Sequence, residues 1–135
     1  RPMEACRQAA ASKPDDWVLR ELTARLLVGL DDYSAAQAEW LEVARLIPHA
    51  ARPHNEIGKF LQQQGKTDEA RASFAKALEL NPDSAEAHVG LGSLDQAQGS
   101  RAKAIRHFRQ ALRLDPTRTE TAKDLERLLQ SQSKP

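Results

Sequence analysis

The side chains most able to do chemistry are few, and their spacing does not favour catalysis. His54 and His88 lie 34 residues apart, and Cys6 is the only cysteine. Two imidazoles without a nearby pair of carboxylates make a poor zinc site, and a lone thiol can form neither an internal disulfide nor a thiolate metal centre. We therefore interpret both histidines as packing residues, possible neighbours on adjacent helices, and Cys6 as buried and unreactive.

Motifs for the common enzyme chemistries are also missing. The sequence contains no glycine-rich phosphate loop, no H-E-x-x-H and no C-x-x-C. We predict that the chain is not an enzyme and that it uses no metal and no cofactor. No apolar run approaches the length that spans a bilayer, which predicts a soluble chain without membrane insertion. The sequence leaves its localisation open between the cytoplasm and the periplasm.

Charge gives one local feature in a chain whose formal net charge is only +1. In the helix expected over 100–114, Arg106, Arg109 and Arg113 share a face, and this stretch contains no acid. Such a face could meet phosphates, but it lacks the interleaved aromatics that stack on bases. Three following acids could neutralise it in part: Glu120, Asp124 and Glu126. We interpret it as a solvated face and predict no nucleic-acid partner.

These residues must be positioned by a scaffold, and a 34-residue repeat indicates which one. Each repeat ends in a proline, at Pro14, Pro48, Pro82 and Pro116. Small residues recur in phase, at Ala24, Gly58 and Gly92 and again at Ala36, Ala70 and Ala104. One large aromatic recurs, at Trp40, Phe74 and Phe108. Small residues let helices approach closely, the aromatic fills the space between them, and proline ends the second helix.

The repeat predicts an all-α fold of three helix–turn–helix units. The expected helices are Trp17–Leu30, Ser34–Ile47, Pro53–Gln64, Thr67–Leu80, Ser84–Gln98 and Ser100–Leu114. The expected N-caps are Asp15, Ser34, Thr67, Asp83 and Ser100. Gly65 and Gly99 are expected to end the first helix of their units in a left-handed conformation.

The two ends differ from the units between them. Cys6, Ala9 and Pro14 fall in the columns of a preceding unit. We interpret Met3–Ser12 as the second helix of a partial repeat, which would mean that the natural protein continues; an ordinary capping helix is the alternative. After Thr119 an apolar stripe predicts a C-terminal capping helix, at Ala122, Leu125, Leu128 and Leu129. The last residues, 131–135, are expected to fray.

The repeat resembles the tetratricopeptide repeat (TPR) family, whose 34-residue unit has the pattern W-x2-L-G-x2-Y, then A, F and P. The second unit matches best, through Gly58, Leu61, Ala70, Phe74 and Pro82. The family's Trp is replaced in every unit, by Arg20, His54 and His88, and Asp95 replaces an aromatic in the third. The resemblance implies one α-solenoid domain over 1–135, with a partial repeat at 1–16, units at 17–50, 51–84 and 85–118, and a capping helix and tail at 119–135.

The resemblance further implies a right-handed superhelix whose concave groove is lined by the first helix of each unit. The groove residues it implies are Glu21, Arg25, Arg52, Asn55, Glu56, Lys59, Gln62, Gln63, Glu86, Val89, Ser93 and Gln96. Arg25, Arg52, Asn55 and Lys59 could form one cluster of donors for a carboxylate or an extended backbone. A merely solvated concave face is the alternative. The two-carboxylate clamp of chaperone-binding TPR domains is not expected, because Asn55 and Lys59 are exchanged and Gly90 replaces the following Asn.

These observations predict a protein–protein interaction module, a scaffold or adaptor that binds a peptide or partner protein in the groove. One alternative is a non-catalytic docking or regulatory segment of a larger enzyme. Another is a self-assembly element with weak association through the solenoid ends. Residues 1–50 carry six Lys and Arg against eight Asp and Glu, and residues 85–135 carry nine against six, so the two ends differ in sign at −2 and +3.

Overall fold

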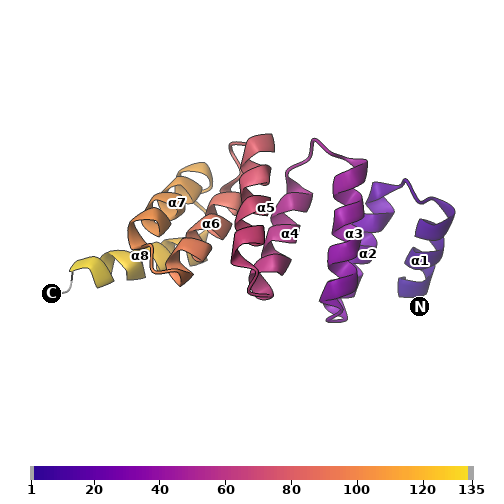
Figure 1. Cartoon of the computed structure of the whole chain (residues 1–135), viewed down its shortest axis with the longest axis horizontal. Coiled ribbons are helices and arrows are strands. Elements are labelled where there is room, and N and C mark those ends of the chain that lie inside the picture. Colours follow the sequence, from indigo (N-terminus) through magenta and orange to yellow (C-terminus); the bar gives the residue numbers. More distant parts are fainter. Residues whose placement is uncertain (1, 134–135) are drawn as a thin grey trace.

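The computed structural model describes residues 2–133, which form eight helices and no strand (Figure 1). The helices are α1 (Pro2–Ser12), α2 (Trp17–Gly29), α3 (Tyr33–Leu46), α4 (Arg52–Gln63), α5 (Thr67–Leu80), α6 (Ala85–Ala97), α7 (Arg101–Leu114) and α8 (Thr119–Ser133). The six helices expected from the repeat are all present, and their bounds agree with the expected ones within two residues.

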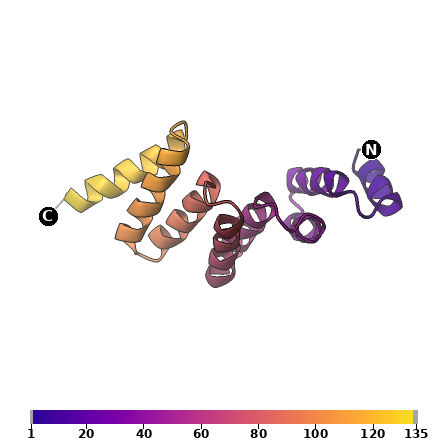
Figure 2. The ribbon, with the colours of Figure 1, turned by 90° about the horizontal axis from the view of Figure 1, so that it is seen from above.

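The helices stack in chain order along the long axis, and the two ends of the chain lie at opposite ends of the stack (Figures 1 and 2). Contact is most extensive within the pairs α2/α3, α4/α5 and α6/α7, and each pair also packs on the next. α1 packs on α2 and α8 packs on α7. The predicted all-α solenoid of helix pairs is therefore confirmed.

The repeat columns form the core. The aromatic of each unit is buried, with Trp40, Phe74 and Phe108 at most 2% exposed. The column of small residues explains how this is possible: a Cβ added at Gly58 would lie 2.8 Å from the ring of Phe74. The same ring lies against Gly90 on α6, so one aromatic joins α4, α5 and α6.

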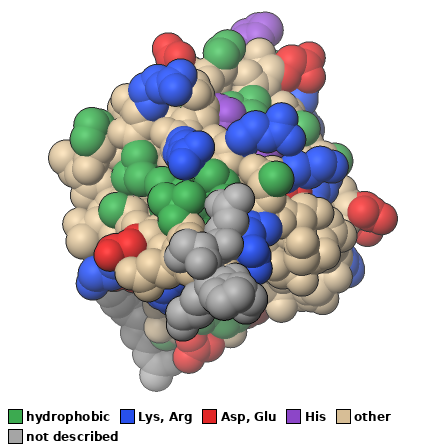
Figure 3. All heavy atoms as spheres, turned by 90° about the vertical axis from the view of Figure 1, so that its left-hand side faces the viewer, with side chains coloured by type: hydrophobic (Ala, Val, Ile, Leu, Met, Phe, Trp, Pro, Cys, Tyr) green, Lys and Arg blue, Asp and Glu red, His purple; other side chains and the backbone are tan. Residues whose placement is uncertain are grey.

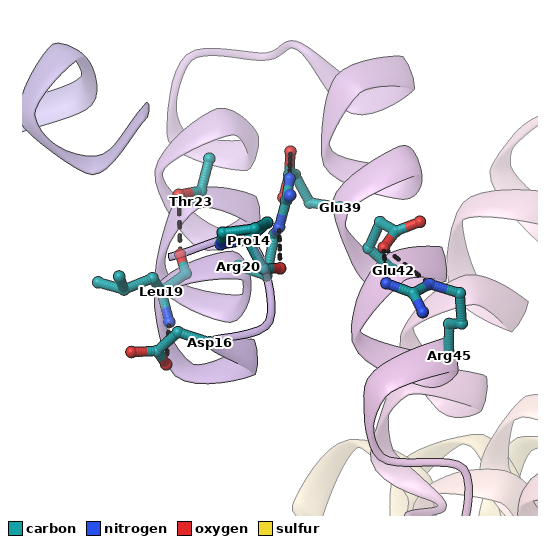
Figure 4. A network of polar contacts seen from close by, with 8 residues as sticks. All are labelled: Pro14, Asp16, Leu19, Arg20, Thr23, Glu39, Glu42 and Arg45. Atoms are coloured by element: carbon teal, nitrogen blue, oxygen red, sulfur yellow. Dashed lines mark hydrogen bonds and ion pairs between the residues drawn. The ribbon is translucent and has the colours of Figure 1, made fainter. Parts of the chain in front are cut away.

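Arg20 shows how one departure from the family pattern is used (Figure 4). Its guanidinium donates to both carboxylate oxygens of Glu39 on α3, at 3.3 and 3.2 Å. It also donates to the carbonyl oxygen of Pro14, in the turn before α2, at 3.5 Å. Arg20 and Glu39 are only about one-fifth exposed, so water competes weakly for this pair. The side chain at the Trp position thus fixes α2 against α3.

The helix starts differ from the predicted ones in detail. Asp16, not Asp15, caps α2, and Asp32, not Ser34, caps α3, because each of these carboxylates accepts backbone N–H groups of the first turn. Ser84, not Asp83, caps α6. At α5 the N-cap is Lys66 rather than Thr67, without a side-chain bond, and Ser100 occupies the N-cap of α7 without making one.

The predicted left-handed turns are present at Gly65 and Gly99, with φ of 77° and 79°. Asp31 adopts the same conformation in the first unit, with φ of 61°. Asp tolerates this region better than most residues with a Cβ, but less well than Gly. The turn is therefore conserved in shape among the three units although its residue changes.

At the two ends, three details differ from the predictions. Cys6 is half-buried rather than buried. In α8 the buried positions are Thr121 and Leu128, with Leu125 and Leu129 packed beside them, whereas Ala122 is exposed. The helix also continues to Ser133, so it includes residues 131–133 of the segment that was expected to fray, and 134–135 lie outside the described residues.

Candidate peptide-binding groove

The first helices of the units, α2, α4 and α6, face one another along one side of the solenoid, and ion pairs join them. Glu21 of α2 pairs with Arg52 of α4 at 2.5 Å. Lys59, two turns further along α4, pairs with Glu86 of α6. These contacts place four of the predicted groove residues on a common face, which we call the groove.

The cations of the groove are not free, which corrects the expected donor cluster. Arg25 pairs with the same carboxylate as Arg52, that of Glu21, at 3.0 Å. Lys59 lies 3.3 Å from Glu56 as well as in contact with Glu86. Burial opposes the charge of Lys59, but its hydrogen bond to Glu86 and the charge of Glu56 more than offset burial and raise its pKa. The groove therefore presents mixed, internally compensated charge.

Asn55 does not reach the surface of the groove, contrary to its predicted role as a donor there. Its side chain is 3% exposed, and its amide donates to the hydroxyl of Ser84 at 3.0 Å. That hydroxyl in turn accepts the backbone N–H of Ala87 and so caps α6. Asn55 thus joins the second unit to the start of the third, and its part in the groove is structural.

A hollow of about 140 Å³ lies between α4 and α6, and five predicted groove residues line it. They are Lys59, Gln62, Glu86, Val89 and Ser93. The ring of Phe74 also borders the hollow, and Arg118 reaches it from the turn before α8. The hollow therefore brings together an ammonium, an amide, a carboxylate, a hydroxyl and apolar groups. Gln63 and Gln96 are exposed near the ends of α4 and α6, outside this hollow.

The α2 end of the groove is apolar. Val18 and Leu22 are 55% and 45% exposed on α2, and Val28 is exposed one turn beyond Arg25. A second hollow, of about 330 Å³, lies between α1 and α2 and is lined by Met3, Arg25, Leu26, Gly29 and Leu30. The predicted binding residues of the first unit, Glu21 and Arg25, are both charged, and the apolar side chains at the neighbouring groove positions are the sequence signal for this apolar end.

The side chains that sequence reasoning missed lie on the other side of α6. The histidine that His88 contacts is His107 on α7, and their Nδ1 atoms are 3.2 Å apart. Asp95, in the column of a family aromatic, is 2% exposed and pairs with Arg71 of α5 at 3.0 Å. The sequence did carry a signal for the contact between His88 and His107. These residues are 19 apart, as are Arg20 and Glu39, which pair at the same positions of the first unit.

The electrostatics of this cluster favour neutral imidazoles. Burial is the main cause that lowers the pKa of both His88 and His107, and His88 also feels the charge of its neighbour. Asp95 opposes the effect at His107, while Arg71 and Arg106 add to it. No group of three His, Cys, Asp or Glu side chains among residues 2–133 is placed to hold a metal ion.

Comparison with known proteins identifies the architecture. The family model described as tetratricopeptide repeat matches residues 49–117, just over half of the chain. The chain belongs to the tetratricopeptide repeat family. A comparison with curated protein sequences gives no match. TPR domains are generally non-catalytic modules that bind other proteins, so the family supports a protein-interaction module.

Solved structures of TPR proteins share the fold at low sequence identity. The crystal structure of MamA is 15% identical, with a TM-score of 0.82, and the match covers 96% of this chain and 76% of that one. The first TPR of Spaghetti (RPAP3), bound to the HSP90 peptide SRMEEVD, is 15% identical with a TM-score of 0.80, covering 87% and 96%. The Arabidopsis OM64 TPR domain is 16% identical with a TM-score of 0.75, covering 83% and 93%.

In the described part of the chain, no helix combines the length and the apolar character needed to cross a bilayer.

Proposed function

We propose that this TPR chain is a non-catalytic module that binds an extended peptide segment of a partner protein along α2, α4 and α6. The observation that carries the proposal is the α4–α6 hollow, where donors, acceptors and the apolar Val89 meet. A hollow of this composition can hold a peptide side chain and also bond to the neighbouring backbone. A similar fold, the first TPR of Spaghetti (RPAP3), is known with a peptide bound.

The groove favours a particular kind of peptide. Its Arg and Lys side chains already have carboxylate partners, so a strongly acidic peptide would have to displace Glu21 and Glu86. An uncharged polar segment that follows an apolar residue suits the surface better. The apolar residue would contact Val18 and Leu22, and the polar part would lie over the α4–α6 hollow.

The test is selection of peptides from a displayed random library, with two variants compared. Ser93→Arg places a long side chain in the hollow, because Ser93 lines it and is half-buried. Ala72→Arg adds the same side chain at an exposed position of α5, outside the hollow, and serves as the matched control. Far-UV circular dichroism is used to check that both variants fold.

We expect the selected peptides to bind the unmodified chain and Ala72→Arg equally, and to bind Ser93→Arg about tenfold more weakly or not at all, a loss of about 1.4 kcal/mol or more. Equal binding to all three proteins would place the peptide outside the hollow and overturn the proposal. A library that yields no binder would do the same.

A further inference from the structure

A third and larger hollow lies between α5 and α7, with α6 at its base. Its volume is about 490 Å³, and its lining includes Arg71 of α5, His88 and Asp95 of α6, and Lys103, Arg106 and His107 of α7. We call it the α5–α7 hollow. His88 and Asp95 share a side of α6, because residues seven apart align on a helix, whereas Glu86 and Ser93, two and five residues from His88, point to the other side. The α5–α7 hollow is therefore separate from the groove.

The charge of the α5–α7 hollow is positive, because its one carboxylate is already used. Asp95 is buried, with Oδ1 3.0 Å from Arg71 and Oδ2 3.7 Å from Nε2 of His107. Lys103 and Arg106 are exposed, and no acid among residues 2–133 lies within ion-pair distance of either. A ligand in the hollow would therefore meet two cations without acidic partners, Lys103 and Arg106, while the carboxylate of Asp95 beneath them is already paired with Arg71.

The basic surface continues along α7. Four basic residues follow one another at intervals of three and four and so share the outer face of the helix: Lys103, Arg106, Arg109 and Arg113.

The acids of α8 do not neutralise this face, contrary to the expectation for Glu120, Asp124 and Glu126. Glu120 and Asp124 pair instead with Lys123 and Arg127 on α8, and no cation of α7 pairs with Glu126. Figure 3, which faces the C-terminal end, shows Lys and Arg side chains gathered around a partly visible His.

The histidine pair adds a second chemistry to the α5–α7 hollow. With Nδ1 atoms 3.2 Å apart, one imidazole donates and the other accepts, so the pair can hold one extra proton but not two facing N–H groups. Asp95 Oδ2 is buried without a hydrogen-bond partner and lies on the Nε2 side of His107. An anion in the hollow would offset the burial that disfavours imidazolium, and His107 would then become a further charged donor.

The structure favours an acidic peptide over a nucleic acid as the ligand. The Phe residues of α5 and α7, Phe74 and Phe108, are both fully buried, so these two helices expose no Phe, Tyr or Trp ring on which a base could stack. From Lys103 to Arg113 the cations span about 15 Å of helix, which matches about five residues of an extended chain. Carboxylates spaced along such a chain can each meet one cation.

We propose that the α5–α7 hollow and the adjoining outer face of α7 form a second interaction surface, which binds an acidic segment of a partner protein. This proposal does not depend on the groove. The two surfaces lie on opposite sides of α6, so one solenoid can hold two segments at once and connect them.

The test is fluorescence anisotropy at low ionic strength with a labelled peptide in which Asp and Glu alternate with Ser. The same peptide with Asn and Gln in place of Asp and Glu is the uncharged control. Inorganic phosphate and a short single-stranded DNA are added as competitors. The double variant Lys103→Glu/Arg106→Glu reverses two exposed charges at the hollow, and Arg7→Glu/Lys13→Glu reverses two exposed charges on and beside α1 as the matched control.

We expect the acidic peptide to bind the unmodified chain and the control variant alike, and Lys103→Glu/Arg106→Glu at least about tenfold more weakly. Ser93→Arg, which blocks the groove, leaves this binding unchanged, so failure of one proposal is distinguishable from failure of the other. No binding of the acidic peptide, or an equal loss in both double variants, would overturn the proposal. Displacement by DNA at lower concentration than by peptide would assign the surface to nucleic acid instead, and displacement by phosphate alone would reduce it to a small-anion site.

Discussion

Gly90 and Phe74 offer the sharpest test of how the units are packed together. A Cβ at position 90 would lie 2.4, 2.5 and 2.7 Å from three atoms of the Phe74 ring. Ordinary contact begins at 3.4 Å, so the ring would have to move by about 1 Å. It has no free space for this, because it is 0% exposed and its atoms also lie 2.8 Å from the Cβ position of Gly58. Gly90→Ala therefore forces α6 away from α5.

The expected magnitude follows from two opposed terms. Overpacking a core position costs up to about 3 kcal/mol, and three ring atoms under 3.0 Å place this site at the upper end. Replacing Gly by Ala inside a helix returns about 1 kcal/mol. We expect Gly90→Ala to lower the free energy of unfolding by about 2 kcal/mol. Gly29→Ala is the control, because nothing lies within 4 Å of its Cβ position, and it is expected to stabilise by about 0.5 kcal/mol.

Urea unfolding followed by circular dichroism measures both variants. Phe74→Leu removes the ring, so Gly90→Ala made in that background is expected to lose most of its cost. The interaction energy between the two sites is then about 2 kcal/mol in a double-mutant cycle. If Gly90→Ala stabilises the chain as Gly29→Ala does, or if its cost is the same with Leu at position 74, the ring is not wedged between α4 and α6 and the packing argument fails.

Three further outcomes are expected. Gly65→Ala lowers the free energy of unfolding by about 1 kcal/mol in urea titration, since its φ of 77° disfavours any Cβ; no change would mean that the turn is not held left-handed. Arg20→Ala costs about 1–2 kcal/mol, and the same cost in a chain that already carries Glu39→Ala would show that the pair contributes nothing. Burial lowers the pKa of His88 and His107, so below the ordinary histidine pKa of 6.5 the unfolded chain binds more protons than the folded chain, and thermal stability decreases as the pH falls. His107→Gln is expected to reduce this pH dependence of thermal stability, and an unaltered dependence would exclude the histidine pair as its cause.

The fold could be predicted from sequence because its determinants recur at fixed intervals. The aromatic is buried in every unit, at Trp40, Phe74 and Phe108, and in the second and third units a glycine lies directly against its ring. The N-cap residues of the helices were harder to predict, because several Asp and Ser residues are adjacent at the helix starts and any of them can cap the first turn. At α2 and α3 an Asp that accepts backbone N–H groups sets the start, at Asp16 and Asp32.

Four of the predicted groove residues share one face in the structure, but the ion pairs between them could not be predicted from the sequence. The repeat indicates which residues face the concave side, but a column of residues within one unit does not show how far the neighbouring unit is rotated. That rotation brings Glu21 to Arg52 and Glu86 to Lys59, and it turned expected free donors into ion pairs. The ion pair of Asp95 could not be predicted for a related reason, because its partner Arg71 belongs to the preceding unit.

The ion pairs of Arg52 and Lys59 also have a mechanical consequence. They connect consecutive units directly, across α2, α4 and α6, and the basic partner of each pair is about half exposed to solvent. Exposed ion pairs weaken as salt is added, whereas the buried core that joins the same units does not. We therefore expect the groove side of the solenoid to become less stiff as salt is added, while the packed helices keep their order.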